Sequence, residues 1–206
     1  MLEPIIHGFI LALGLILPLG AQNIFIFNQG VNYKGLKSVV PVIITAGLCD
    51  TVLILLAILG VSIIFYSIPV LQVIIYCVGL VFLIYMAWAL WHENSTKMNQ
   101  QERMSIKKQI SFAISVSILN PHAVMDTVGV IGTNATLYHD ERKIAFTIAT
   151  IIVSWLWFIS LAILGKYFHR FDKTGIYIKA LNKISSIIIL IVALMIVKQL
   201  VQLFMS

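Results

Sequence analysis

Two acidic side chains, Asp50 and Asp126, lie inside segments that are apolar enough to be buried in lipid. A carboxylate near the centre of a membrane helix costs about 2.5 to 3.5 kcal/mol on insertion scales, and such residues usually mark ion pathways, proton relays or substrate counter-ions. Neither segment contains a Lys or Arg that could neutralise its acid. The pair therefore predicts a site for a cation that arrives from outside the chain, either as a substrate or as a proton.

Each half of the chain also carries a polar patch with a proline, one from Pro18 to Asn23 and one from Asn120 to Asp126. Proline removes a backbone donor and clashes with the carbonyl four residues earlier, and the polar groups freed at membrane depth are tolerated only against a cavity or other protein. Paired helix breaks in two halves predict a substrate site near the midplane. The predicted site residues are Gln22, Asn23, Asp50, Asn120, His122 and Asp126, with Pro18, Gly20 and Pro121 as helix-breaking residues.

The second patch also predicts a polar helix face. On an α-helical template His122, Asp126, Gly129 and Thr133 share one side, so the carboxylate is expected to face a stripe of small and polar residues. A metal site built on His122 and Asp126 would need further ligands, and the nearby sequence supplies no second pair. We therefore expect no metal and no other cofactor.

Composition indicates a membrane protein without a soluble domain. Hydrophobic residues make up 60% of the chain, charged residues only 11%, and the mean hydropathy is +1.01, whereas about a quarter of a soluble domain is charged. The net charge of +6 reflects the flanks of membrane helices, since no basic face or stacking motif indicates a nucleic-acid surface. The expected partners are therefore the lipid bilayer and a small-molecule substrate. A homo-oligomer is compatible with the sequence, although no GxxxG motif marks a dimer face.

Apolar runs of about 20 residues, the length that crosses the hydrocarbon core, can be placed six times. They cover residues 4–27, 39–64, 69–91, 110–132, 144–165 and 184–204. All Lys and Arg residues except Arg142, Lys143 and Lys198 lie in the connectors after the first, third and fifth runs. The positive-inside rule makes those connectors cytoplasmic and puts both termini outside. The membrane expected for this multi-pass chain is the cytoplasmic membrane of a prokaryote. A five-helix alternative, in which Pro18 prevents the first run from spanning, moves the N-terminus inside.

The predicted fold class is an all-α, polytopic membrane protein whose six helices form two inverted three-helix repeats. We interpret the chain as one domain, with a first repeat over residues 1–91, a cytoplasmic connector over 92–109 and a second repeat over 110–206. An odd number of spans in each half forces the second half to run inverted, as in many secondary transporters. The pentapeptide Leu-Ala-Ile-Leu-Gly supports this weakly, since it ends both the second run, at Gly60, and the fifth, at Gly165.

These motifs resemble those of a known family. The residues Gly8 to Leu15, continuing into Pro18 to Asn23 and then Asn28 to Gly30, resemble the N-terminal signature of the LysE family of amino-acid exporters. Leu119 to Thr127, continuing to Ile131 and Gly132, is similar to the second motif of that family. The resemblance covers the whole chain and implies the lysine and arginine exporter branch, because the branch for neutral amino acids typically lacks the second Asp. One departure is Leu19, which puts little in doubt.

The function expected is therefore secondary active export of basic amino acids, lysine or arginine, coupled to inward movement of protons. An exporter of neutral amino acids or of a metal cation remains an alternative, with the same acids serving the proton or the ion. An intramembrane aspartyl protease is a remote alternative, because neither Asp follows the glycine pair of a GxGD motif. A non-catalytic scaffold gives no reason to keep two unpaired acids in lipid. We expect a transporter and not an enzyme.

The distribution of basic residues predicts the outcome of cysteine labelling. Cysteines introduced at Arg103 and at Lys173 should react with an impermeant thiol reagent only when it reaches the cytoplasmic side, because both positions lie in Lys- and Arg-rich connectors. Labelling of either position in intact cells would contradict the predicted orientation.

Overall fold

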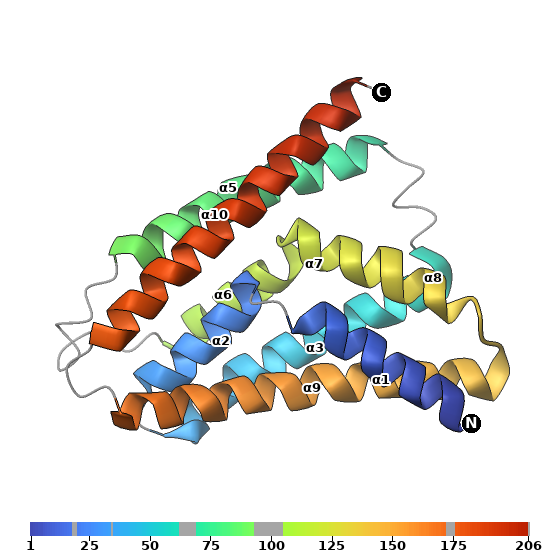
Figure 1. Ribbon diagram of the computed structural model, residues 1–206, viewed down its shortest axis with the longest axis horizontal. Coiled ribbons are helices and arrows are strands. Elements are labelled where there is room, and N and C mark those ends of the chain that lie inside the picture. The colour runs from blue at the N-terminus through green and yellow to red at the C-terminus, as the bar shows by residue number, and fades with distance from the viewer. Residues whose placement is uncertain (18–19, 34, 62–68, 93–104, 172–175, 206) are drawn as a thin grey trace.

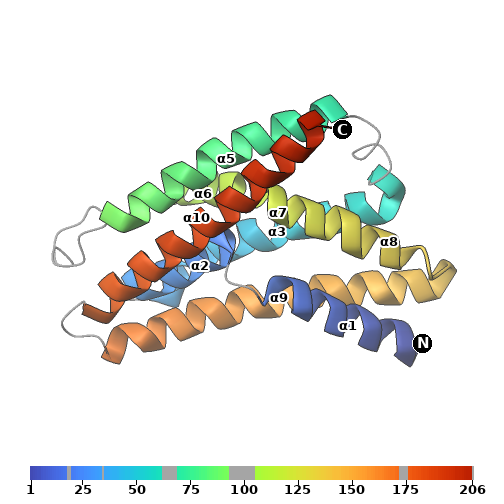
Figure 2. The same cartoon turned by 45° about the horizontal axis from the view of Figure 1, so that its top comes forward.

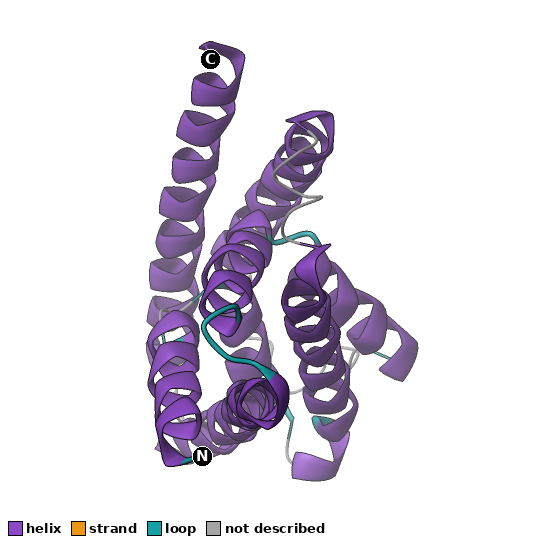
Figure 3. Cartoon of the chain, turned by 90° about the vertical axis from the view of Figure 1, so that its right-hand side faces the viewer, coloured by secondary structure: helices purple, strands orange, loops and turns teal. Residues whose placement is uncertain are grey.

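The computed structural model describes residues 1–206 except 18–19, 34, 62–68, 93–104, 172–175 and 206. Every regular element in these described segments is a helix (Figure 3). The expected all-α class is therefore confirmed for the described part of the chain.

Four helices are individually long and apolar enough to cross a membrane. They are α3 (Val40–Leu56) together with the π-helical turn that follows it, α5 (Pro69–His92), α9 (Asp140–Phe171) and α10 (Ile176–Met205). A short 3₁₀ turn, η1 (Leu36–Ser38), precedes α3, and a π-helical turn, η2 (Ala57–Val61), extends it.

The other two expected spans are each broken into two helices. The first consists of α1 (Leu2–Ile16) and α2 (Ala21–Asn32), whose axes differ by 78°. The second consists of α6 (Ile106–Ile118) and a following segment bent away from it by 60°. That segment contains α7 (Pro121–Met125), the π-helical η4 (Asp126–Ile131) and α8 (Gly132–Ala135). If each bent pair is one span, the described helices supply six.

The helices form two groups, which Figures 1 and 2 show from two directions. In one group α9 lies along both α1 and α2, and α3 packs against α6 and α9. In the other, α10 lies along α5, and this pair meets the first group through α2 and α7. The ends of α2, α5 and α9 gather at one end of the molecule, whereas both termini lie toward the opposite end (Figure 1).

Three glycines allow the close approach of α1 and α2 to α9. A Cβ added at Gly30 would overlap the carbonyl oxygen of Ala162, and one at Gly165 would overlap that of Phe27. At Gly8 an added Cβ would lie 2.8 Å from the carbonyl oxygen of Phe146. Without a hydrophobic driving force between helices in lipid, such small residues stabilise the contact by allowing tight packing.

The two pentapeptide glycines do not share a role. Gly165 packs against α2, whereas Gly60 has a positive φ of 88° and no neighbouring atom within 4 Å of an added Cβ. Gly60 therefore permits the turn that closes η2, because other residues adopt this backbone region rarely. The repeated pentapeptide therefore does not correspond to equivalent packing in the two halves.

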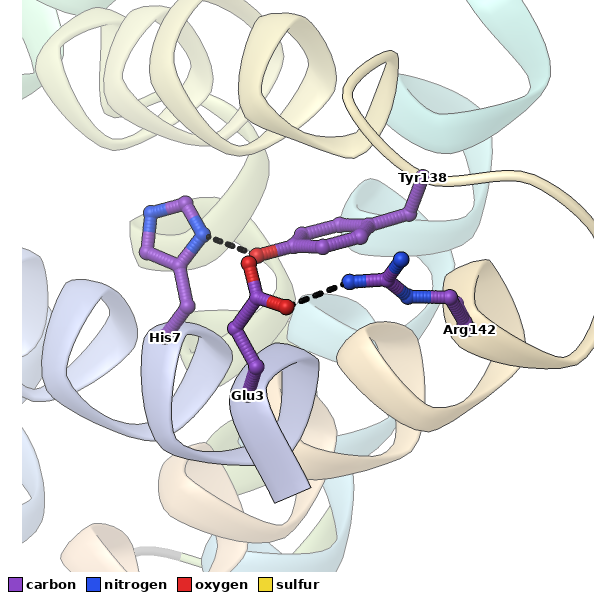
Figure 4. A network of polar contacts seen from close by, with 4 residues as sticks. All are labelled: Glu3, His7, Tyr138 and Arg142. Carbon is purple, nitrogen blue, oxygen red and sulfur yellow. Dashed lines mark hydrogen bonds and ion pairs between the residues drawn. The ribbon is translucent and has the colours of Figure 1, made fainter. Parts of the chain in front are cut away.

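A polar network fixes the start of α1 against the start of α9 (Figure 4). The ring of His7 forms a 2.8 Å hydrogen bond with the Tyr138 hydroxyl, and Arg142 donates to the carboxylate of Glu3. The Arg142 guanidinium also lies over the Tyr138 ring, 5.5 Å from its centroid. The Glu3–Arg142 pair is exposed, so its own contribution to stability is small.

The glycine contacts predict a selective sensitivity of the bundle to added methyl groups. Gly30→Ala should lower the thermal unfolding midpoint of the purified protein, because forcing a methyl group against α9 costs about 1–3 kcal/mol of stability. Gly14→Ala is the matched control, since an added Cβ there has no atom within 4 Å. Equal unfolding midpoints for the two variants would contradict the role of Gly30 in α2–α9 packing.

Candidate functional site

A central cavity of ≈ 200 Å³ lies where both broken spans meet the other helices. Its apolar walls include Leu15 of α1, Leu83 of α5, Ile131 of η4 and Ile189 of α10. Its polar wall consists of Gln22, Asn23, Asp50, Asn120, Thr127 and Ser154, together with the backbone of Gly20 and Ala21. A mostly apolar pocket with a few convergent polar groups is the usual form of a small-molecule site.

Asp50 of α3 supplies the carboxylate of this cavity. Its Oδ1 accepts a 3.1 Å hydrogen bond from Nε2 of Gln22, and the Ser154 hydroxyl of α9 is a second hydrogen-bond partner. Among the residues that the structure describes, no Lys or Arg lines the cavity. The carboxylate is therefore held by neutral donors from two helices while its charge has no basic partner in the lining.

Contacts beside Asp50 fix its helix against α9. The indole Nε1 of Trp155 donates a 3.1 Å hydrogen bond to the Thr51 hydroxyl, which itself donates to the carbonyl of Gly47. The Trp155 ring occupies the space that a side chain at position 47 would need. These contacts determine where α3 places its carboxylate.

The first break is bridged by a side chain. Asn23, 5% exposed, donates a 2.6 Å hydrogen bond from Nδ2 to the carbonyl of Ile16, in the last turn of α1. The last carbonyls of a helix lack intrahelical donors, so this bond satisfies a group that lipid could not. Gly20 is the N-cap of α2 and makes no side-chain cap hydrogen bond.

The second break begins at Asn120. Leu119 ends the hydrogen-bond ladder of α6 by donating to Ser115, and Val124 donates a 3.1 Å bond to the carbonyl of Asn120. The Asn120 side chain is only 6% exposed, and its Oδ1 has no hydrogen-bond partner within the described structure. A buried acceptor without a donor costs about 1–3 kcal/mol.

Several predicted site positions are only partly described. The backbones of His122 and Asp126 lie in α7 and η4, immediately after the second break, but their side chains fall outside the described structure. Pro121 is the first residue of α7, while Pro18 lies outside the described residues. The described structure therefore brings together Gly20, Gln22, Asn23, Asp50 and Asn120 around one cavity.

The α-helical template beyond Met125 is wrong. From Asp126 to Ile131 the helix is π-helical, with a wider turn that shifts the direction of every following side chain. Thr133, expected on the same helix face as Asp126, is exposed and donates to the carbonyl of Gly129. Thr127 lines the cavity instead.

Sequence reasoning also missed Ser154, which is 5% exposed and lies in the cavity wall. A hydroxyl in the middle of an apolar span is a weak signal, because serine often hydrogen-bonds to its own helix backbone. Ser160, six residues later in the same helix, does so by donating to the carbonyl of Leu156. Only the packing of α9 against α3 distinguishes the two serines.

Comparison with known proteins gives a consistent set of relatives. A family model for LysE type translocators matches residues 13–200. YisU of Bacillus subtilis, which carries the name of an amino-acid transporter, is 47% identical over 186 residues, covering 90% of this chain and 84% of that protein. The arginine exporter protein ArgO of Serratia proteamaculans is 27% identical over 199 residues, covering 94% of this chain and 96% of that protein.

ArgO of Pectobacterium atrosepticum is 29% identical over 167 residues, covering 79% of this chain and 80% of that protein. No solved structure matches this chain. The relatives are transport proteins by name, and the family match over residues 13–200 includes both helix breaks.

Proposed function

The chain belongs to the LysE family of translocators, and from that premise we propose that it is a secondary exporter of basic amino acids, arginine or lysine. The family and the names of its relatives describe transporters rather than enzymes. The ArgO relatives, at 27–29% identity, support arginine as a substrate.

The observation that carries this proposal is the Asp50 carboxylate in the central cavity. Gln22 and Ser154 donate neutral hydrogen bonds to it, so the carboxylate is oriented but its charge is not cancelled. A guanidinium or ammonium group that leaves water for the midplane needs a negative partner, because the transfer of an unpaired charge into an apolar medium is very unfavourable. Asp50 would serve as that partner.

Asp126 is proposed as the second acid of the transport path. Its backbone lies in η4, one residue before Thr127, which lines the same cavity. π-Helical turns within α-helices frequently occur at functional sites. His122 and Asn120, at the start of the same half-span, complete the polar side of this proposed path.

Energetics favour coupling to protons. Moving one positive charge outward against an inside-negative membrane potential costs about 2.3 kcal/mol per 100 mV. Inward movement of one proton for each exported cation cancels this electrical cost. We propose that the two acids alternate between binding the substrate cation and binding a proton.

The arrangement of helices supports an inverted repeat, which we also propose. Each half begins with a broken span. The break of the first half lies between α1 and α2, and the break of the second half lies between α6 and the segment that ends with α8. The broken span of each half packs against the middle span of the other, α9 for α1–α2 and α3 for α6. The third spans, α5 and α10, pack against each other, as a twofold relation between the halves requires.

The same proposal includes an orientation in the cell membrane. The ends of α2, α5 and α9, which enter the basic connectors, share one end of the bundle (Figure 1). We assign that end to the cytoplasm and both termini to the outside.

The counter-ion role predicts the effect of removing the charge. Asp50→Asn and Asp126→Asn should each reduce export of arginine and lysine by at least about 100-fold, as expected when a buried ion pair worth about 3 kcal/mol is lost. The measurement is uptake of radiolabelled arginine, lysine and leucine into inside-out vesicles that contain equal amounts of each variant. Asp50→Glu should retain partial activity, because the charge survives in a displaced position.

Asp140→Asn is the matched control, since Asp140 is exposed at the start of α9, and its export should equal that of the wild type. Wild-type rates of arginine and lysine export in both Asp variants would exclude the counter-ion role. Equal loss of leucine export would assign the acids to the proton rather than to the substrate cation.

A further inference from the structure

The first turn of α2 presents backbone donors that the proposed role of Asp50 does not use. The helical ladder of α2 begins with the N–H of Ile24 donating to the carbonyl of Gly20, so the N–H groups of Ala21 and Gln22 precede it. The N-cap of this helix, Gly20, has no side chain that could cap it. The same turn lines the central cavity. With 12 residues, α2 is long enough for its peptide dipoles to add up at this end.

Asp50 does not occupy these donors. Its described hydrogen bonds come from the side chains of Gln22 and Ser154 rather than from the backbone of α2. A helix N-terminus carries a partial positive charge of roughly half an elementary charge, which favours an anionic group of a ligand. The cavity therefore offers a positive pole at the α2 N-terminus and a negative pole at Asp50.

An independent feature beside the α2 N-terminus also indicates a ligand. Asn120 is 6% exposed, lines the same cavity, and has an Oδ1 without a partner in the described structure. Its amide nitrogen faces the α2 N-terminus, since a Cβ added at Gly20 would lie 3.9 Å from Nδ2. A buried carbonyl oxygen that meets no protein donor is suited to a donor that arrives with the ligand.

We propose that the break between α1 and α2 binds the main-chain head group of the substrate amino acid. The α-carboxylate accepts hydrogen bonds from the N–H groups of Ala21 and Gln22, and the α-ammonium donates to Oδ1 of Asn120. This assignment rests on the proposed function in that the ligand is an amino acid, but it holds for any side chain. Asp50 then remains available for the guanidinium or ammonium group at the end of the substrate side chain.

The proposal explains why Gly20 carries no capping side chain. Ser, Thr, Asp and Asn are the favoured N-caps, because their side-chain oxygen accepts a hydrogen bond from the N–H of the second or third helical residue. Here those residues are Gln22 and Asn23, and a capping oxygen at either N–H group would compete with the substrate carboxylate. Glycine brings no side-chain oxygen to these N–H groups, and its own φ of −75° is open to other residues.

Gly20→Ser therefore separates binding from folding. The added side chain has space, since only Asn120 Nδ2 lies within 4 Å of the new Cβ. The thermal unfolding midpoint should stay equal or rise, because the serine caps α2. The KM for arginine should rise about 10-fold or more, the loss expected for one charge-assisted hydrogen bond.

Competition with agmatine, which is arginine without its carboxylate, gives the direct readout. In wild-type vesicles agmatine should inhibit arginine transport at least about 10-fold more weakly than unlabelled arginine does. In Gly20→Ser vesicles this difference should shrink, since inhibition by agmatine does not involve the blocked donor. Equal inhibition by both compounds in the wild type, or an unchanged difference in Gly20→Ser, would overturn the carboxylate assignment.

Asn120→Ala tests the ammonium contact by a separate comparison. The wild type should prefer arginine to 5-guanidinopentanoate, which lacks only the α-amino group, and the variant should lose that preference. Asn32→Ala, an exposed position at the end of α2, should keep it. An unchanged preference in Asn120→Ala would overturn this contact.

Failure of the basic-substrate proposal can be distinguished from failure of the head-group proposal. If the wild type transports neither arginine nor lysine, the basic-substrate proposal fails. The head-group proposal is then tested by uptake of radiolabelled leucine, in competition with unlabelled leucine or with isoamylamine, its counterpart without a carboxylate. Equal inhibition of this uptake by the two compounds would overturn the head-group proposal.

Discussion

The structure depends on one constraint, which is that backbone polar groups inside a bilayer need partners within the protein. Two helices break near the middle of their spans, at angles of 78° and 60°, and each break exposes helix ends that lipid cannot satisfy. Both breaks therefore lie against a shared cavity. Asn23 satisfies one freed carbonyl directly, while the first turn of α2 and the side chain of Asn120 face the cavity.

The surrounding helices hold these breaks in place. Gly30 and Gly165 allow the backbones of α2 and α9 to lie in direct contact. Trp155 of α9 donates a hydrogen bond to Thr51 of α3, next to Asp50. The cavity is closed from the other side by Leu83 of α5 and Ile189 of α10, the two helices of the second group. The site therefore lies between two groups of helices, with its polar residues on one and apolar walls on both.

The sequence predicted the features that follow from chemistry at fixed positions. Proline and charge in an apolar chain indicated the spans, the two breaks and Asp50, because their cost in lipid is independent of detailed packing. The sequence did not indicate the π-helical turn at Asp126–Ile131, and it did not single out Thr127, which lines the cavity. Ser154 was missed for a related reason, since only the contact between α9 and α3 distinguishes it from serines that bond to their own helix.

The central claim is that a basic amino acid occupies the cavity beside Asp50. Ser154→Cys, in a protein with Cys49 and Cys77 replaced by alanine, puts a thiol in the cavity wall next to this carboxylate. The direct measurement is the rate at which a small cationic thiol reagent modifies that cysteine in the presence and absence of arginine. The account predicts that arginine slows the modification and that an equal concentration of sucrose does not. An identical rate with and without arginine would contradict it.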